Sequence, residues 1–228
     1  MNVDIVVPVH NEEMYIDEFI ARVDALGLRE ALIFVDNAST DGTVPCIERH
    51  TGVRLIRHNR NAGYGASIRD GIAGSQAAVI VIIDGDLEYP PEAIPQLLTA
   101  IDDHAVVYAS RFGGDLRPDM PWTRRFGNTV LSDVFNVLFR QATTDLYTGM
   151  KALRREVAQS LVLSRDGFEH VVEMGVQLAQ AGHHIHEIPV SYAPRTRGVS
   201  KMRHMRETSK YTWFIGMSWL RLRVFHRS

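Results

Sequence analysis

Cysteine is nearly absent: the chain of 228 residues contains only Cys46. A single thiol cannot form an internal disulfide, and a zinc site built from a cysteine cluster is excluded as well. The N-terminal residues also lack the basic start, apolar stretch and small-residue cleavage site of a signal peptide, so export is not expected. We therefore expect a protein of the reducing cytoplasm.

Neither sign of charge dominates, because 25 Lys and Arg residues stand against 27 Asp and Glu residues and give a formal net charge of -2. Proteins that bind nucleic acid usually carry a clear basic excess that neutralises backbone phosphates. Nucleic acid is therefore not an expected partner.

Long apolar runs are lacking too. The uncharged part of the Trp-rich C-terminal stretch covers only residues 211–220, whereas a membrane-spanning helix needs roughly 20 residues.

The glycine turn of a dinucleotide-binding fingerprint is missing after the first strand-like segment, and no P-loop occurs. Gly63 and Gly65 open a helical pattern after a later strand, but the position three after Gly65 is Ile68. An NAD-dependent oxidoreductase is therefore not expected. The two glycines still allow positive φ and close backbone approach to a ligand at a helix start.

What the chain does contain is an alternation of short apolar runs and helical patterns, with 45% hydrophobic residues overall. Strands are expected at 3–9, 31–35, 53–56, 79–83, 105–109 and 184–192. Helices are expected at 12–26, 43–50, 66–73, 91–101, 123–139, 156–163 and 169–181. Near-continuous apolar strands indicate a sheet covered on both faces. The predicted fold is a single α/β domain with a mostly parallel mixed sheet flanked by helices, over residues 1–204.

Polar, acidic loops follow the best of these strands, where ligands bind in open α/β sheets. Asp84 and Asp86 come directly after a buried strand, where two carboxylates repel each other and lose solvation unless a cation neutralises them. Carboxylate oxygens suit Mg2+ or Mn2+, which usually keep waters and bridge substrate phosphates. An ordinary Asp-rich turn is the alternative. Asp36, after another strand, is suited either to capping a turn or to binding a nucleotide.

The ordered motifs "VVPVHNEE", "VDNASTDGT", "NRNAGYGASIRDGI" and "IIDGDLEYPPE" resemble glycosyltransferase family 2. Further along, "SRFGG", "RRFGN", "DLYTGMKALRRE" and "IPVSYAPRTRGVSKM" resemble its polyprenyl-phosphate branch, the dolichyl-phosphate mannose synthases and their bacterial relatives. The resemblance spans residues 3–202 and implies a GT-A, Rossmann-like fold. It implies an inverting transfer, assisted by Mg2+ or Mn2+, from a nucleotide-diphosphate sugar to a polyprenyl phosphate, as in cell-envelope biosynthesis.

The resemblance also assigns roles on the donor side. The nucleoside would be held by Pro8, Glu12 and Asp36, while Asp41 would support their loop. Asp84 and Asp86 would match the metal and sugar pair, with Asp86 the surer metal ligand. Glu88 stands where the synthases have Gln and would complete the metal set.

On the acceptor side, the resemblance places Arg111 and Arg125 where the family gathers the acceptor phosphate, with Arg124 as the neighbouring register. Three further residues would close over the donor diphosphate, namely Arg195, Ser200 and Lys201. A metal ion with Arg and Lys would stabilise the charge of the departing diphosphate. Asp86, Arg111 and Arg125 are therefore the expected catalytic residues.

Two other functions remain open. A hydroxyl acceptor on a saccharide, small molecule or protein needs a base to take its proton, and Glu169, His170 and Glu173 are the candidates. An acceptor phosphate is already an anion and needs none. A sugar-nucleotide-binding protein without catalysis is the third function, and the intact acidic and basic residue sets argue against it.

The C-terminal segment 205–228 is expected to contain an amphipathic helix over residues 211–225. It either docks on the core or lies on the inner face of the cell membrane, with Trp and Phe among the headgroups and terminal arginines against anionic lipid. His183, His184 and His186 are not expected to bind metal, because only His184 and His186 share a face of a strand.

Overall fold

A computed structural model describes residues 2–112, 120–194 and 211–220, apart from the Arg124 side chain. Its elements are, in chain order, β1 (Val3–Val9), α1 (Glu13–Asp24), η1 (Arg29–Ala31), β2 (Leu32–Asp36), α2 (Thr43–Glu48), β3 (Arg54–Arg57), α3 (Tyr64–Gly74), β4 (Val79–Ile82), η2 (Pro91–Ala93), α4 (Ile94–Ala100), β5 (Val106–Ser110), α5 (Trp122–Phe139), β6 (Lys151–Arg154), α6 (Arg155–Ser160), α7 (His170–Gln180) and β7 (His186–Pro189).

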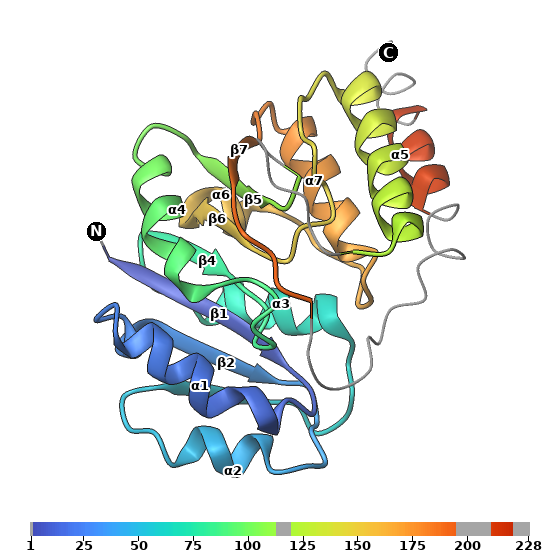
Figure 1. The fold of residues 1–228 in the computed structure, drawn as a ribbon. Helices are drawn as coiled ribbons and strands as arrows, with labels where there is room; N and C mark the ends of the chain where they lie inside the picture. The colour runs from blue at the N-terminus through green and yellow to red at the C-terminus, as the bar shows by residue number, and fades with distance from the viewer. Residues whose placement is uncertain (1, 113–119, 195–210, 221–228) are drawn as a thin grey trace.

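The strands form one sheet in the order β3-β2-β1-β4-β6-β5-β7, with helices on both faces (Figure 1). β6 runs antiparallel to β4 and β5, and the other pairs are parallel. The predicted single α/β domain with a mostly parallel mixed sheet is therefore confirmed.

Two apolar clusters hold the helices against the sheet. β1 is buried along its whole length, and its alternate residues Ile5 and Val7 face the cluster that contains side chains of α1, α2 and α4. Val6 faces the other cluster, built with side chains of α3, α5, α6 and α7. A strand of this kind must be apolar on both faces, which is why its sequence predicted it correctly.

Sequence reasoning missed β6, the strand that runs antiparallel to both of its neighbours in the described sheet. It begins with Lys151 and ends with Arg154, so its pattern does not resemble a buried strand. Register with β4 nevertheless pairs Ile82 with Lys151 and Val79 with Arg154. The expected strand over 184–192 is also shorter, since β7 covers only His186–Pro189.

The C-terminal stretch forms a helix over residues 211–220, drawn in red in Figure 1. Tyr211 and Ile215 are buried in the same apolar cluster as side chains of α5 and α7. Trp213 points the other way and is 72% exposed. Within the described ranges, no helix combines the length and apolar character needed to cross a bilayer.

Candidate active site

A pocket of about 350 Å³ opens at the carboxyl ends of β1 and β4. Its walls come from the loops after these strands, the start of α3, the first turns of α5, the loop before α7, and the start of the 211–220 helix. Sequence-predicted residues in its lining are Pro8, Glu12, Asp84, Asp86, Glu88 and Arg111. The expected convergence of strand-end loops therefore holds for these residues.

The acidic wall is formed by the loop after β4. The Asp86 side chain is buried, and its Oδ1 accepts a 3.0 Å hydrogen bond from the Glu88 amide. Asp84 Oδ1 accepts a 2.7 Å hydrogen bond from the Tyr64 hydroxyl. Asp84 Oδ2 lies so close to Gly149 that a Cβ added there would come within 2.2 Å of it. The glycine therefore makes room for the carboxylate.

Burial and the neighbouring Asp86 charge raise the pKa of Asp84 to about 7, against the opposing effects of Tyr64 and Lys151. A divalent cation would relieve this repulsion, so the donor set fits one. Among the described residues, however, no group of three or more His, Cys, Asp or Glu side chains is arranged to hold a metal. Asp84, Asp86 and Glu88 do not form a complete protein cage, as is usual for ions that also take waters and substrate phosphates.

Asp36 is not one of the described residues that line the pocket. Both of its oxygens accept the Ser39 amide, at 3.2 and 3.3 Å, and the side chain is buried. Its observed contacts are those of a turn cap. Asp41 has the loop-supporting geometry expected for it, because its Oδ1 accepts the Thr43 hydroxyl at 2.6 Å and the Thr43 amide at 3.0 Å.

Sequence reasoning missed a polar corner of the pocket formed by Asn37 and Asn61. Asn37 Nδ2 donates to Asn61 Oδ1 at 3.0 Å, and Asn37 Oδ1 accepts the Ala62 amide at 2.7 Å. Both residues line the pocket beside His10. Their motifs were recognised, but only the contact across two loops shows that the amides act together.

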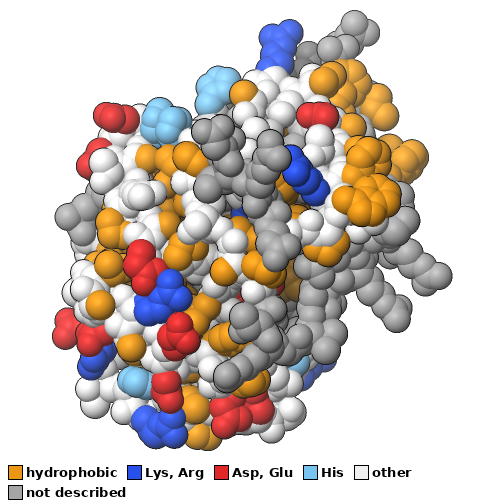
Figure 2. Space-filling model, in the orientation of Figure 1, with side chains coloured by type: hydrophobic (Ala, Val, Ile, Leu, Met, Phe, Trp, Pro, Cys, Tyr) orange, Lys and Arg blue, Asp and Glu red, His pale blue; other side chains and the backbone are white. Residues whose placement is uncertain are grey.

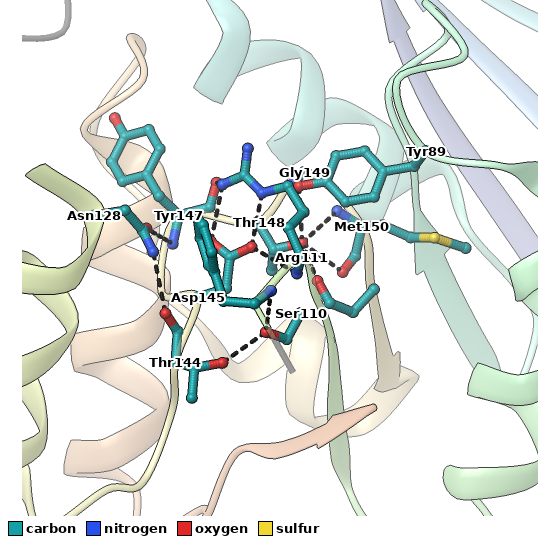
Figure 3. Close-up of polar contacts among 12 residues, drawn as sticks. Tyr89, Ser110, Arg111, Asn128, Thr144, Asp145, Tyr147, Thr148, Gly149 and Met150 are labelled. Carbon is teal, nitrogen blue, oxygen red and sulfur yellow. Dashed lines mark hydrogen bonds and ion pairs between the residues drawn. The ribbon is translucent and has the colours of Figure 1, made fainter. Parts of the chain in front are cut away.

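The basic wall is a buried ion pair (Figure 3). Arg111 Nε and Nη2 donate to the two oxygens of Asp145 at 2.7 and 2.8 Å, and Nη2 also reaches the Tyr147 carbonyl at 3.4 Å. The guanidinium lies over the rings of Tyr89 and Tyr192, 5.7 and 5.4 Å from their centroids. Arg111 is thus held at the pocket by charge, hydrogen bonds and aromatic faces.

Asp145 is itself anchored from β7. Its amide donates to Glu187 Oε1 at 2.9 Å, and the Thr144 amide donates to Oε2 at 2.8 Å. The motif that contains Asp145 was recognised in the sequence, but no role was assigned to this residue. An Asp in a loop carries no signal that it pairs with an arginine that follows a distant strand.

The structure does not bring Arg125 to this pocket. The pocket face of α5 presents Thr123, Gly127, Asn128 and Leu131, whereas Arg125 is exposed and is not among the described residues of the lining. The Arg124 side chain lies outside the described residues. So do Arg195, Ser200 and Lys201, which were expected to close over the donor diphosphate.

The three candidate bases do not line the pocket within the described ranges. The Glu173 carboxylate accepts the Ser164 amide and hydroxyl and the Arg165 amide, at 2.6 to 3.1 Å. His170 is buried, and burial together with the charges of Lys151 and Arg69 lowers its pKa to about 3. Glu173 is therefore a loop cap, and His170 is neutral at physiological pH.

Lys151 is a buried cation that sequence reasoning did not single out. Its Nζ donates to the Thr148 carbonyl and lies 5.0 Å from the centroid of the Tyr108 ring. Burial lowers its pKa to about 8, while the Asp84 and Asp145 carboxylates act in the opposite direction. A positive charge thus lies beneath the acidic wall and partly offsets it.

Comparison with known proteins agrees with this arrangement. The model of the family described as Glycosyl transferase family 2 matches residues 4–162. A dolichol-phosphate mannosyltransferase of Pyrococcus furiosus is 28% identical over 214 residues, a match that covers 89% of this chain and 60% of that relative. A dolichyl-phosphate hexose transferase of Haloferax volcanii is 30% identical over 193 residues, covering 84% of this chain and 82% of the relative.

Among solved structures, glucosyl-3-phosphoglycerate synthase from Mycobacterium tuberculosis, in complex with Mn2+, uridine diphosphate and phosphoglyceric acid, superposes with a TM-score of 0.71. The match covers 96% of this chain and 77% of that chain at 20% identity. The similarity establishes the GT-A fold that the motifs implied.

Proposed function

The chain belongs to glycosyltransferase family 2, and from this premise we propose that it transfers a sugar from a nucleotide-diphosphate donor to a polyprenyl phosphate. The observation that carries the proposal is the shared pocket, in which the acidic Asp84 and Asp86 face the same space as Arg111. The named relatives that act with dolichol phosphate support the acceptor class.

The acidic wall suggests how the nucleotide-sugar donor would be bound. Asp84 and Asp86, with Glu88 nearby, would hold Mg2+ or Mn2+, and Pro8, Glu12 and the Asn37 corner would surround the nucleoside. The chemistry that such an ion supplies is stabilisation of charge on the leaving diphosphate. Outside the described residues, Arg195, Ser200 and Lys201 belong to the same proposal as contacts of the diphosphate.

The position of Arg111 suggests how the acceptor phosphate would be bound and would react. An oxygen of the acceptor phosphate attacks the anomeric carbon, the bond from this carbon to the diphosphate oxygen breaks, and the electron pair leaves with the diphosphate. Attack from the face opposite the leaving group inverts the configuration. Arg111 would hold the acceptor phosphate by hydrogen bonds and charge. No proton has to be removed, which suits a site where Glu173 is engaged in capping and Glu169 and His170 do not line the pocket.

The protein is further proposed to be cytoplasmic and to contact the inner face of the membrane. Figure 2 shows apolar side chains gathered on the side of the molecule where α5 lies. Trp122 and Phe126 of α5 are 75% and 63% exposed, and Trp213 of the C-terminal helix is also exposed. Both helices contribute to the pocket wall through Thr123 and Tyr211. A lipid-linked acceptor would then reach the pocket from the membrane surface.

In the same proposal, residues 1–204 form the glycosyltransferase domain and residues 205–228 a peripheral C-terminal segment. The burial of Tyr211 and Ile215 ties this segment to the domain core. It would therefore lie between protein and lipid, with its exposed side facing the headgroups.

The test is a transfer assay with labelled nucleotide sugars, Mn2+, and three acceptors: a short-chain polyprenyl phosphate, the matching alcohol and phosphoglyceric acid. We expect transfer to the polyprenyl phosphate, loss of activity with a chelator, and loss of activity in Asp86→Asn. Asp103→Asn, an exposed carboxylate, is the matched control. Transfer to the alcohol alone would refute the lipid-phosphate acceptor, and transfer by Asp86→Asn at the normal rate would refute the metal site.

A further inference from the structure

Tyr64 connects two walls of the pocket that come from distant parts of the chain. Its hydroxyl donates to Asp84 Oδ1 at 2.7 Å on the acidic wall. Its ring stacks on Phe168 from the loop before α7, with centroids 5.0 Å apart and planes inclined by 19°. The edge of the His170 ring meets it from the side at 5.3 Å. The phenol is therefore fixed in both position and direction.

The loop that carries Phe168 is itself fastened to the start of α3. Gly65 N donates to the Asp166 carbonyl at 2.7 Å, and Arg69 forms a 2.9 Å ion pair with Asp166. A Cβ on Gly63, whose φ is +98°, would come within 2.2 Å of the Asp166 carbonyl oxygen. This close backbone approach needs glycine, and it sets where Phe168 meets Tyr64.

The other end of the loop is held by α7, because the Glu173 carboxylate caps Ser164 and Arg165. Displacement of the loop would therefore break several partly buried hydrogen bonds. On the far side of Asp84, the close packing of Oδ2 against Gly149 limits rotation of the carboxylate. Tyr64 and Gly149 together define one orientation for Asp84.

We propose that Tyr64 is a positioning residue for the acidic pair. Its hydroxyl orients the Asp84 carboxylate toward a divalent cation, and its stacked ring makes this orientation depend on the position of the loop that carries Phe168. The inference rests on the proposed function, since it concerns the cation of that site. The inference predicts that cation affinity depends on the Tyr64 hydroxyl and on the Phe168 ring, although neither group is a metal ligand in the proposed function.

The test compares Tyr64→Phe, which keeps the stacked ring and removes the hydroxyl, with the wild-type chain. Tyr108→Phe is the control, because it removes the hydroxyl of a fully buried tyrosine, and this hydroxyl has no hydrogen-bond partner among the described residues. Mn2+ binding is followed by the electron paramagnetic resonance signal of the free ion, with UDP present in one series and GDP in another. Thermal unfolding is measured for each variant.

We expect the Mn2+ dissociation constant of Tyr64→Phe to rise about tenfold, the loss typical of a hydrogen bond to a charged group. The unfolding temperature should match that of Tyr108→Phe, whose Mn2+ affinity should equal the wild-type value. Phe168→Leu, which removes the stacking partner, should raise the constant by about threefold. An unchanged constant in Tyr64→Phe would overturn the inference while leaving the proposed function standing. A wild-type chain that binds no Mn2+ in either series would overturn both.

Discussion

Arg111 and Asp145 form a two-point ion pair in which Nε–Oδ2 and Nη2–Oδ1 are 2.7 and 2.8 Å apart. The Asp145 side chain is completely buried and the Arg111 side chain is 12% exposed. The bonds to Asp145 occupy the Nε and Nη2 side of the guanidinium, and the arginine still lines the pocket. The pair therefore has a structural role and a ligand-binding role, which substitutions can separate.

The structural role predicts a large stability loss in Asp145→Asn. The amide keeps the shape of the carboxylate, but Arg111 loses its counter-charge in a desolvated place, where breaking a buried pair costs about 3–5 kcal/mol. Glu48→Gln is the control, because its pair with Arg57 is more than half exposed on both sides and is worth about 1 kcal/mol or less. Urea unfolding measures both variants, and similar small losses in the two would contradict the prediction.

The binding role predicts that Arg111 and Arg125 differ. Arg111→Lys keeps the charge but loses the planar fork, so we expect the KM for polyprenyl phosphate to rise at least about tenfold while donor hydrolysis changes little. Arg125→Ala should stay near the wild-type KM, because the residue is exposed and is not among the described residues of the lining. Initial rates at varied acceptor concentration give the KM of each variant and test the difference. An Arg125→Ala variant as damaged as Arg111→Lys would place the acceptor outside the pocket.

The sequence predicted the strands that apolar runs mark, and the motif order predicted the fold and most of the acidic wall. Both succeed because β1 and β4 are buried on both faces and their loops must meet at one sheet edge. β6 was missed because Lys151 is buried by its contacts with Thr148 and Tyr108, which no local pattern reveals.

Long-range contacts explain the other gaps in the predicted site. Arg125 was placed by motif register, but the turn of α5 decides which of its residues face the pocket. Glu173 was a candidate base by its position in the sequence, and its four hydrogen bonds to Ser164 and Arg165 make it a cap. Tyr64 lay in a recognised motif, yet its role depends on Asp84 and Phe168, which come from other segments.

A pH dependence of stability follows from His170. Its folded pKa of about 3 lies below the ordinary value of 6.5. Below pH 6.5 the unfolded chain binds a proton that the folded chain does not, so this contribution to stability is complete above pH 6.5 and is lost as the pH falls toward 3. At pH 5 the loss is about 2 kcal/mol.

His170→Phe should remove this part of the pH dependence, since His170 Nδ1 has no hydrogen-bond partner among the described residues and its surroundings include the Tyr64 ring. The measurement is the free energy of unfolding in urea at pH 7 and pH 5 for the wild type and the variant. Carboxylates that titrate in both proteins cancel in the comparison. If both proteins lose the same free energy between the two pH values, His170 is not responsible.

The exposed aromatic side chains Trp122, Phe126 and Trp213 carry the last prediction, which concerns the membrane. Ending the chain before residue 211 would also remove the buried Tyr211 and Ile215 from the core, so substitutions of exposed residues are the sharper test. We expect Trp122→Ser, Phe126→Ser and Trp213→Ser together to weaken sedimentation with anionic vesicles at least about tenfold, because each aromatic side chain contributes on the order of 1–3 kcal/mol when it leaves water.

The control for this experiment is Val162→Ser, which removes an apolar side chain that is 79% exposed and does not line the pocket within the described ranges. It should sediment like the wild type. Activity supplies a second readout: the triple variant should keep its rate with a short, detergent-dispersed polyprenyl phosphate and lose it with the same acceptor embedded in vesicles, because only the second must be reached across a lipid surface. Equal sedimentation of the wild type and the triple variant would rule out these side chains as the membrane contact, whatever the acceptor proves to be.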